Sequence, residues 1–327
     1  MKLLDEIKNI NKYIKSSKSI FLMAHKNLDL DAIASTIGMC HILKSLNKEC
    51  FIVIDDEIHE MGVEKVLREM DGCYNIIKSN QVKQHFHKRA HKNLLIILDT
   101  NKKDLLPNKE ILNEFQKIIV IDHHDMGKTS IRNGIIVIDT ESSSASELIV
   151  NLANYYNIEF TTYIATLLLA GITLDTNNFT LNTNEETFYI AYFLSAYGAS
   201  NKKVQYLLKQ DITKYSEQQK LLTNIEIVNK NIAIAKGTPH AIYRKEDLAR
   251  IADTLLFFND IDIAIVVGKT GKDIVGVSAR SLDKNIEKLM DKLGGGGNKN
   301  NAGATLEKKR ISEVVEKIKK ILKEEEK

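Results

Sequence analysis

The sequence predicts an α/β protein in which a mainly parallel sheet domain is joined by a helical linker to a smaller α/β C-terminal domain, with a cleft between them. Short apolar runs rich in Ile and Val recur over the first 140 residues and show little alternation, which is typical of strands buried on both faces. Helical patterns separate several of these runs. The pattern changes after about residue 230, and 327 residues are long for a single core.

The first domain is predicted to span residues 1–200, with helices at 31–46 and 144–156. Ser144 and Glu147 have the spacing of a capping box at the start of the second helix. Strands are expected at five apolar runs, 19–25, 49–55, 93–100, 117–124 and 133–140. Because strands alternate with helices here, the sheet should be mainly parallel.

The second domain is predicted over residues 229–327, after a polar helical linker at 201–228. The segment "KTGK" between two apolar runs indicates a hairpin turn. The expected strands lie at 231–237, 261–268 and 273–280, and the expected helices at about 284–293 and 311–325.

Composition and charge narrow the class of protein. With 43% hydrophobic and 27% charged residues, the chain has the composition of a globular protein. The net charge is only +3, and because Lys and Arg are spread along the sequence we expect no binding to duplex nucleic acid.

The cysteines and the lengths of the apolar runs bear on location. Cys40, Cys50 and Cys73 form no C-x-x-C pair, which indicates reduced thiols. No apolar run is long enough to cross a bilayer, so we expect a cytoplasmic protein that does not bind membranes. A homodimer is compatible with the sequence.

Acidic and imidazole side chains follow the predicted strands. The carboxyl ends of parallel strands share one edge of a sheet, where ligands bind. Carboxylates crowded there would repel one another unless cations lie between them. Mixed carboxylate and imidazole ligands suit Mn²⁺, Mg²⁺, Fe²⁺ or Zn²⁺, and a bridging carboxylate suits a two-metal site. The residues concerned are His25, Asp29, Asp31, Asp99, Asp122, His123, His124 and Asp175.

The segments that carry these residues resemble the four motifs of the DHH phosphoesterases, and they read "HKNLDLDAIAS", "LDT", "DHH" and "GITLDTNNF". Further on, "ADTLL", "GVSARS" and "KLGGGG" are similar to the DHH-associated C-terminal domain, so the resemblance covers nearly the whole chain. Within the superfamily, "ESSSASELI" and "GVSARS" look closest to the catalytic half of the GdpP-type, membrane-anchored cyclic di-AMP phosphodiesterases.

The resemblance implies a role for each acid and imidazole residue. His124 would face the scissile phosphate, and Asp122 would orient its neighbouring histidines. The resemblance implies two divalent metal ions, with Mn²⁺ expected and Mg²⁺, Fe²⁺ or Co²⁺ as alternatives. One ion would be held by His25, Asp29 and Asp99, and the other by Asp31, Asp99, His123 and Asp175.

A glycine run in the second domain is a candidate phosphate-binding loop. Consecutive glycines let a backbone approach a ligand closely, although a helix end followed by a loop has the same pattern. Beside Arg280 and Ser281, and with the resemblance, the run is expected to bind substrate. Asn298 stands where the family usually has His, which puts one side-chain contact to the substrate in doubt. The run consists of Gly294, Gly295, Gly296 and Gly297.

The resemblance implies a metal-dependent phosphodiesterase that acts on a small nucleotide, opening cyclic di-AMP to 5′-pApA. One alternative is the cutting of pApA or short oligoribonucleotides to mononucleotides, as in the nanoRNase and pAp-phosphatase relatives. A manganese inorganic pyrophosphatase is a weaker alternative, because its C-terminal domain uses a basic motif in place of the glycine run. A nucleotide-binding sensor without catalysis is another, although every expected metal ligand is present in the sequence.

Overall fold

The computed structural model describes residues 2–56 and 59–325. The chain divides into two compact units, Met1–Lys209 and Gln210–Lys327, which we call unit 1 and unit 2. Each hydrophobic cluster of buried residues lies within one unit, so each unit has a core of its own. Within the described ranges, no helix is both long and apolar enough to span a membrane.

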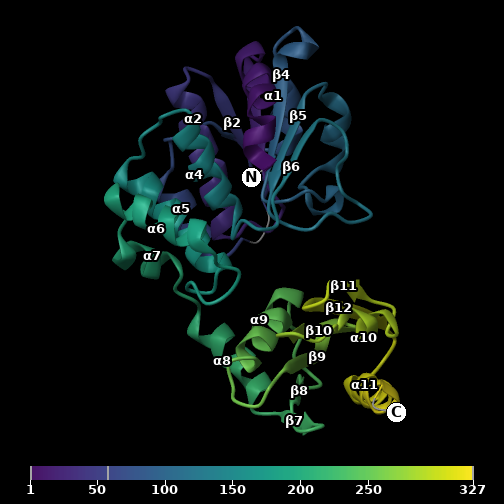
Figure 1. Ribbon diagram of the computed structural model, residues 1–327. Helices are drawn as coiled ribbons and strands as arrows, with labels where there is room; N and C mark the ends of the chain where they lie inside the picture. Colours follow the sequence, from purple (N-terminus) through teal and green to yellow (C-terminus); the bar gives the residue numbers. More distant parts are fainter. Residues whose placement is uncertain (1, 57–58, 326–327) are drawn as a thin grey trace. The chain divides into compact units, whose positions relative to one another are not determined.

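Unit 1 is built on a six-stranded sheet with the order β3-β2-β1-β4-β5-β6 (Figure 1). Every neighbouring pair of strands is parallel, so the predicted parallel sheet is confirmed. The order reverses between β1 and β4, and this switch point is where α/β sheets open a ligand crevice. The strands are β1 (Ser19–Met23), β2 (Cys50–Val53), β3 (Ile76–Ile77), β4 (Asn93–Leu98), β5 (Ile118–Asp122) and β6 (Ile135–Ile138).

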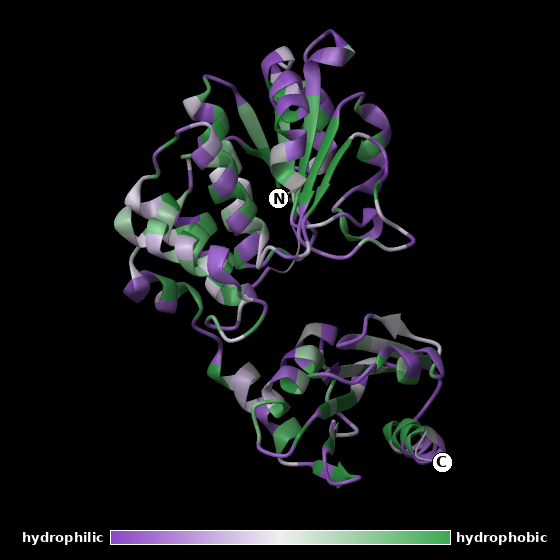
Figure 2. Ribbon diagram, viewed as in Figure 1, coloured by the Kyte–Doolittle hydropathy of each residue, from purple (hydrophilic) through white to green (hydrophobic). Residues whose placement is uncertain are grey.

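Both faces of this sheet are covered, as the continuous apolar runs require. In β1, Ile20 and Leu22 belong to the cluster under the long helices, whereas Phe21 and Met23 belong to the cluster on the other face. On that second face, Val82 of η1 (Ser79–His85) and Ile111 of η4 (Lys109–Glu114) pack against the strands. Two further short 3-10 helices of unit 1 are η2 (Ala90–Lys92) and η3 (Lys103–Leu105). Figure 2 shows the strands of unit 1 as mainly hydrophobic ribbons.

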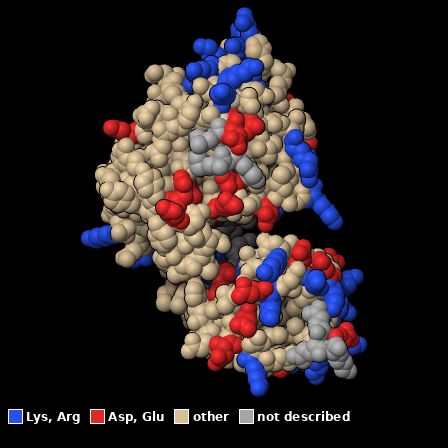
Figure 3. Space-filling model, viewed as in Figure 1, with Lys and Arg blue, Asp and Glu red and all other residues tan. Residues whose placement is uncertain are grey.

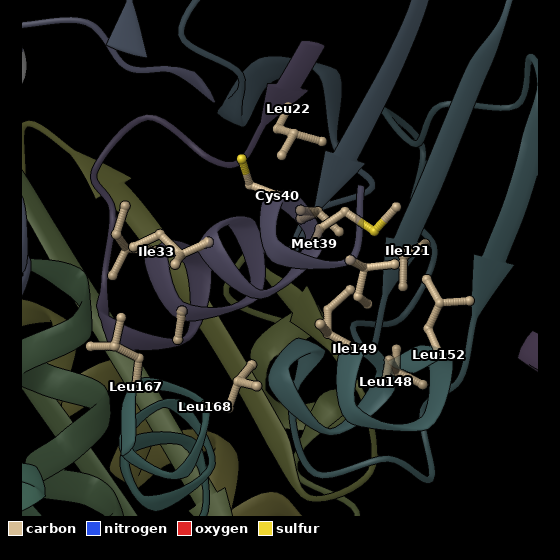
Figure 4. Close-up of a cluster of buried hydrophobic side chains, with 14 of the residues drawn as sticks. Leu22, Ile33, Met39, Cys40, Ile121, Leu148, Ile149, Leu152, Leu167 and Leu168 are labelled. Atoms are coloured by element: carbon tan, nitrogen blue, oxygen red, sulfur yellow. The ribbon is translucent and has the colours of Figure 1, made fainter. Parts of the chain in front are cut away.

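The helices of unit 1 surround one central helix. This helix, α2, is buried on nearly all sides because it packs against the sheet, α4 and α5. Figure 4 shows Met39 and Cys40 of α2 among Ile149 and Leu168 from the two neighbouring helices. The helices are α1 (Lys2–Ser16), α2 (Leu30–Ser45), α3 (Met61–Glu69), α4 (Ala145–Tyr155), α5 (Thr162–Asp175), α6 (Glu185–Ala196) and α7 (Asn201–Leu207).

The predicted capping box at α4 forms only in part. Ser144 is the N-cap, and its Oγ accepts a hydrogen bond from the Glu147 backbone N–H at 3.1 Å. The Glu147 carboxylate does not return to the N-cap backbone, and instead accepts hydrogen bonds from the Ser143 and Thr187 hydroxyls. Because Thr187 lies in the first turn of α6, the carboxylate ties α4 to α6.

Unit 2 has a mixed six-stranded sheet with the order β11-β12-β10-β9-β8-β7. Only β8 and β9 pair in parallel among these described strands, and a tight turn joins β9 to β10 where a hairpin was predicted. Its strands are β7 (Ile225–Val228), β8 (Ile232–Lys236), β9 (Ile263–Gly271), β10 (Ile274–Ser281), β11 (Gly296–Gly297) and β12 (Asn301–Glu307). Its helices are α8 (Ile212–Leu222), α9 (Lys245–Leu255), α10 (Glu287–Asp291) and α11 (Ile311–Glu325).

Lysines that are spread along the sequence gather in space at the amino ends of the strands in unit 1. Lys18, Lys48, Lys92 and Lys117 each lie one or two residues before a strand. Burial and the charges of neighbouring lysines lower the pKa values of Lys48 and Lys117. Figure 3 shows the resulting group of basic side chains at the end of unit 1 where the strands begin. The acidic cluster described below lies at the carboxyl ends of the same strands.

Candidate metal centre

The acidic and imidazole residues of unit 1 meet at the carboxyl ends of three adjacent strands. His25 follows β1, Asp99 follows β4, and the run Asp122-His123-His124 closes β5. Because β1 and β4 are neighbours at the switch point, these side chains converge as parallel-sheet geometry requires. Asp175 arrives from a different direction, as the last residue of α5.

Asp29 serves both the helix and the cluster. It is the N-cap of α2, and its Oδ1 accepts a hydrogen bond from the Ala32 backbone N–H at 2.9 Å. Its other oxygen, Oδ2, lies 3.6 Å from His25 Nε2. The loop between β1 and α2 therefore presents one carboxylate oxygen and one imidazole nitrogen to the same point.

Asp99 lies at the centre of the cluster. Its Oδ2 is 3.4 Å from His25 Nε2, and its Oδ1 is 3.5 Å from His123 Nε2. The side chain is buried, and the backbone has a φ of +56°, a left-handed conformation that costs free energy for a residue other than glycine. The turn at the end of β4 holds this conformation, and it aims one oxygen at each of two histidines.

Asp31 and Asp175 complete the cluster beside α4 and α5. Asp175 Oδ2 lies 3.1 Å from His123 Nε2. Asp31 is fully buried, and its two oxygens accept hydrogen bonds from the backbone N–H groups of Ala145, at 2.7 Å, and Ser146, at 2.9 Å. These groups open α4, so the positive end of the helix dipole stabilises the buried carboxylate.

Asp122 orients the ring of His124. The His124 Nδ1–H donates to Asp122 Oδ1 at 2.8 Å, which leaves Nε2 as the outward nitrogen of a ring that is 51% exposed. His123 contacts Asp122 only through its backbone N–H, at 2.9 Å. Asn101 Nδ2 donates to the other oxygen, Asp122 Oδ2, at 2.7 Å, and Ser130 Oγ donates to Asn101 Oδ1 at 2.5 Å.

The pKa values show how strongly these groups act on one another. Burial alone would lower the pKa of His25, but hydrogen bonds and charges from Asp29 and Asp99 raise it to about 11. Burial would also lower the pKa of His123, and Asp175 and Asp99 raise it well above the usual value. Burial raises the pKa of Asp175 to about 6, although contact with His123 opposes the shift. In the absence of a metal ion, protons on the histidines balance the buried carboxylates.

The donor set fits divalent metal ions. His25, Asp29 and Asp99 offer ligand atoms within 4.8 Å of one another, and so do Asp31, Asp99, His123 and Asp175, with Asp99 in both groups. A third group joins Asp99 to the run at the end of β5. Two buried atoms of the cluster, Asp99 Oδ1 and His123 Nε2, have no hydrogen-bond partner among the described residues, so both are open to a cation. Such mixed oxygen and nitrogen donors suit Mn²⁺ and related ions.

In unit 2, the structure places Arg280 at the end of β10, and β12 separates this strand from the short strand β11. Arg280 pairs with Asn301 of β12, and Gly297 of β11 pairs with the next residue of β12. The Arg280 Nε–H donates to Asp253 Oδ1 of α9 at 2.8 Å, and Nη1 donates to Ser278 Oγ and to the Ala279 carbonyl. These contacts fix the plane of the guanidinium.

The local fold of unit 2 itself requires glycine at several positions of the glycine run. Gly294 has a φ of +81° and ends α10, and Gly295 packs so closely that an added Cβ would lie 2.1 Å from the Gly303 carbonyl oxygen. The Asn298 Oδ1 accepts hydrogen bonds from the backbone N–H groups of Asn300 and Asn301. Ser281 Oγ accepts one from the Lys284 N–H at 2.8 Å. The tight hairpin therefore accounts for Gly294, Gly295 and Gly297 without a ligand, whereas an added Cβ at Gly296 would meet no atom within 4 Å.

Sequence reasoning missed Asn101, Ser130 and Asp253. Asn101 stands two residues after Asp99, where a polar residue after a strand was a signal that it could lie beside the cluster. Ser130 lies in an unremarkable polar context, whereas Asp253 belongs to the segment "ADTLL", where the resemblance was a signal; their contacts with Asn101 and Arg280 depend on the tertiary structure. The structure therefore adds three residues whose hydrogen bonds hold the predicted site residues in position.

Comparisons with known proteins agree with these features. Residues 19–172 match the model of the DHH family, N-terminal domain, and residues 229–324 match that of the DHHA1 domain. The chain is 35% identical to the cyclic-di-AMP phosphodiesterase GdpP of Geobacillus thermodenitrificans and 32% identical to PdeA, a cyclic-di-AMP phosphodiesterase of Listeria monocytogenes. These matches cover 96% and 94% of this chain and 48% of each relative, so the chain spans about half their length.

A second kind of relative has a length similar to that of this chain. The bifunctional oligoribonuclease and PAP phosphatase NrnA of Thermus thermophilus is 25% identical, over 94% of this chain and 90% of NrnA. Among solved structures, an exopolyphosphatase-related protein from Bacteroides fragilis has the same fold, with a TM-score of 0.78 at 20% identity over 98% of this chain and 96% of that one. With both domains matched in order, and with relatives at 32–35% identity over most of its length, this chain belongs to the DHH family.

Proposed function

We propose that this chain is a metal-dependent phosphodiesterase that opens cyclic di-AMP to 5′-pApA. The observation that carries the proposal is the placement of Asp99 in two groups of ligand atoms at the switch point of a parallel sheet. A carboxylate shared in this way suits two divalent ions, for which Mn²⁺ is our first candidate. The similarity to GdpP and PdeA over nearly the whole of this chain supports the cyclic substrate.

Each residue of the cluster has a distinct part in the proposed reaction. The residues His25, Asp29, Asp31, Asp99, His123 and Asp175 would hold the divalent ions, which would supply Lewis-acid chemistry and lower the pKa of a bound water. Asp122 holds the Nδ1 proton of His124, so that His124 presents Nε2 to a phosphate oxygen. Although burial would lower the pKa of His124, its hydrogen bond to Asp122 raises the pKa, and a protonated ring stabilises the charge that develops on phosphorus-bound oxygens.

In unit 2, Arg280 is proposed to bind a phosphate of the nucleotide that does not react. Its Nε and Nη1 groups are held by Asp253, Ser278 and the Ala279 carbonyl, so the guanidinium is oriented before any ligand arrives. An oriented guanidinium loses little conformational entropy when it binds a phosphate. Ser281, the backbone of Gly294–Gly297 and Asn298 are proposed as neighbouring contacts at the same end of the sheet.

A linear substrate is the second candidate. The similarity to NrnA, which covers 90% of that protein, favours cleavage of pApA or short oligoribonucleotides to mononucleotides. The same cluster would serve either substrate, because both contain a phosphodiester bond between ribonucleotides.

A product time course separates the two candidates. The purified chain would be incubated with Mn²⁺ and, in separate reactions, cyclic di-AMP, pApA or a short oligoadenylate, and the products would be resolved by chromatography. Build-up of pApA from cyclic di-AMP is the expected result. Release of AMP from the linear substrates while cyclic di-AMP stays intact would overturn the cyclic substrate and favour the second candidate. No turnover of any of the three would overturn the proposed activity.

A further inference from the structure

Unit 1 contains a half-open cavity at its surface that none of the metal-centre residues lines, and its polar side chains are exposed. It has a volume of about 410 Å³ and lies against the sheet face that the 3-10 helices cover. This volume falls within the range of about 300–1,000 Å³ that is typical of small-molecule sites. The floor is apolar, with Ile118 and Ile131 buried beneath it and Leu112 beside them.

Two unpaired cations line the cavity. Lys103 and Arg132 have no ion pair or side-chain hydrogen bond with any residue in the described ranges. A third cation, Lys109, lies 3.8 Å from Asp104, and the only carboxylate of the lining is that of Glu110. Since Asp104 offsets the charge of Lys109, the two unpaired cations against the one carboxylate of Glu110 leave the cavity with a net positive charge that favours an anion.

The backbone brings the two unpaired cations to the same wall. The Lys103 N–H donates to the Thr129 carbonyl at 3.1 Å, and the Ile131 N–H donates to the Asn101 carbonyl at 2.7 Å. These bonds hold the segment after β4 alongside the segment before β6. Lys103 and Arg132 therefore stand on neighbouring backbone segments, and the flat guanidinium of Arg132 suits bidentate contact with a phosphate.

The opposite wall has a different chemistry. It is formed by η4, which contributes Lys109 with its ion pair to Asp104, Leu112, the carboxylate of Glu110 and the carboxamide of Asn113. With the apolar floor, these groups suit a flat ring that carries hydrogen-bond donors and acceptors at its edge. One wall thus matches a phosphate, and the floor and the other wall match a nucleobase.

We propose that this cavity is a binding site for a nucleoside monophosphate, separate from the metal centre. The phosphate lies between Lys103 and Arg132, and the base lies over Ile118 and Ile131 towards η4. The proposal does not depend on the reaction that the chain catalyses, because the cavity contains no ligand of the metal centre.

The test is a set of binding measurements on the full chain with metal ions removed by a chelator. By isothermal titration calorimetry, AMP should bind at least about tenfold more tightly than inorganic phosphate or adenosine alone. Arg132→Ser and Lys103→Ser should each weaken AMP binding about tenfold or more, whereas Lys88→Ser, at an exposed lysine of unit 1 outside the cavity, should not.

Two outcomes with the wild-type chain and the cavity variants would overturn the proposal, and a third would come from a variant of the metal centre. One is that AMP does not bind, or binds no more tightly than phosphate. The other is that both cavity substitutions leave AMP binding unchanged. An Asp99→Asn chain should retain AMP binding, and loss of binding in that variant would place the nucleotide at the metal centre instead. Because binding is measured without metal or turnover, these results are independent of the proposed hydrolysis.

Discussion

At the scale of single residues, the side chains of the acidic cluster are held in place by hydrogen bonds from neighbouring side chains and backbone groups. Asp122 turns His124 outward through one hydrogen bond, and Asn101 fixes the second oxygen of Asp122. Asp31 is held by two backbone N–H groups, and Asp99 by a left-handed turn. The positions of the candidate ligands are thus set by short, directional contacts that any substitution would disturb.

Replacement of Asp122 tests the orientation of His124. Asp122→Asn should lower kcat by about 10–100-fold and leave the bound metal unchanged, because the carboxamide cannot hold the Nδ1 proton in the same way. Steady-state kinetics together with metal analysis would measure this, with Asp104→Asn as a control at an exposed acid of unit 1. Loss of the metal in Asp122→Asn would show that Asp122 acts on the ligands and not on His124.

The protonation of the histidines predicts how metal binding depends on pH. Although burial opposes it, contact with Asp29 and Asp99 raises the pKa of His25 to about 11, so its ring carries a proton at neutral pH when no metal is bound. A metal ion binds only the deprotonated nitrogen, so binding must release protons and Mn²⁺ affinity should rise from about pH 6 to about pH 9. Calorimetry in buffers of different ionisation enthalpy would detect the release. An affinity that is constant over this range would contradict the assignment of His25 as a ligand.

At the scale of elements, the fit between α2, α4 and α5 determines the shape of the site. Gly171 of α5 leaves the space that Asp31 and Ser146 occupy, because an added Cβ would lie 2.7 Å from Asp31 Oδ1 and 2.4 Å from Ser146 Oγ. Asp31 is fixed by the first N–H groups of α4 and cannot move away freely. The packing of α5 against α4 and the position of Asp31, a candidate metal ligand, therefore both depend on the absence of a side chain at Gly171.

Gly171→Ala should for this reason affect stability and metal binding together. We expect a loss of about 1–3 kcal/mol in the free energy of unfolding, the usual cost of overpacking, and weaker Mn²⁺ binding. Urea denaturation and metal titration would measure the two effects. Gly127→Ala is the matched control, since an added Cβ there meets no atom within 4 Å. Unchanged Mn²⁺ binding in Gly171→Ala would mean that Asp31 is not a ligand.

The elements also show what could be predicted from the sequence. The apolar runs of β1, β4 and β5 predicted both the parallel sheet and the edge where His25, Asp99 and His123 meet, because a continuous apolar run and the polar residues that end it are local signals. The strands β7 and β12 were missed, since β7 is partly exposed and "NAGATLE" in β12 has little β-propensity. Such strands form because of their neighbours, which a single sequence does not reveal.

Contacts between distant segments explain the remaining differences. Glu147 has the spacing of a capping box, but the Thr187 hydroxyl, 40 residues away in sequence, is its partner instead. The link between Asp253 and Arg280 spans 27 residues. The cavity beside η4 likewise depends on two loops that only the fold brings together. None of these partners leaves a periodic pattern in the sequence.

At the scale of the whole molecule, two units with separate cores predict independent folding. The clusters of unit 2 contain only residues from 221 onwards, and its sheet shares no strand with unit 1. A fragment of residues 210–327 should therefore fold alone and unfold cooperatively in urea, as measured by circular dichroism. A fragment that stays unfolded would show that unit 1 is required for its core. In the full chain, Mn²⁺ should stabilise only the transition of unit 1, because a ligand stabilises the unit that binds it.

The central claim is that Asp99 joins two metal ions in one site, and the most direct measurement is the number of Mn²⁺ ions bound per chain. Native mass spectrometry and equilibrium titration would be applied to the wild-type chain and to Asp99→Asn, which keeps the shape of the side chain but removes its charge. We expect two ions in the wild type and at least about tenfold weaker binding of both in the variant, because one carboxylate serves both groups of ligands. A single ion in the wild type, or two ions bound as tightly by Asp99→Asn, would contradict the account.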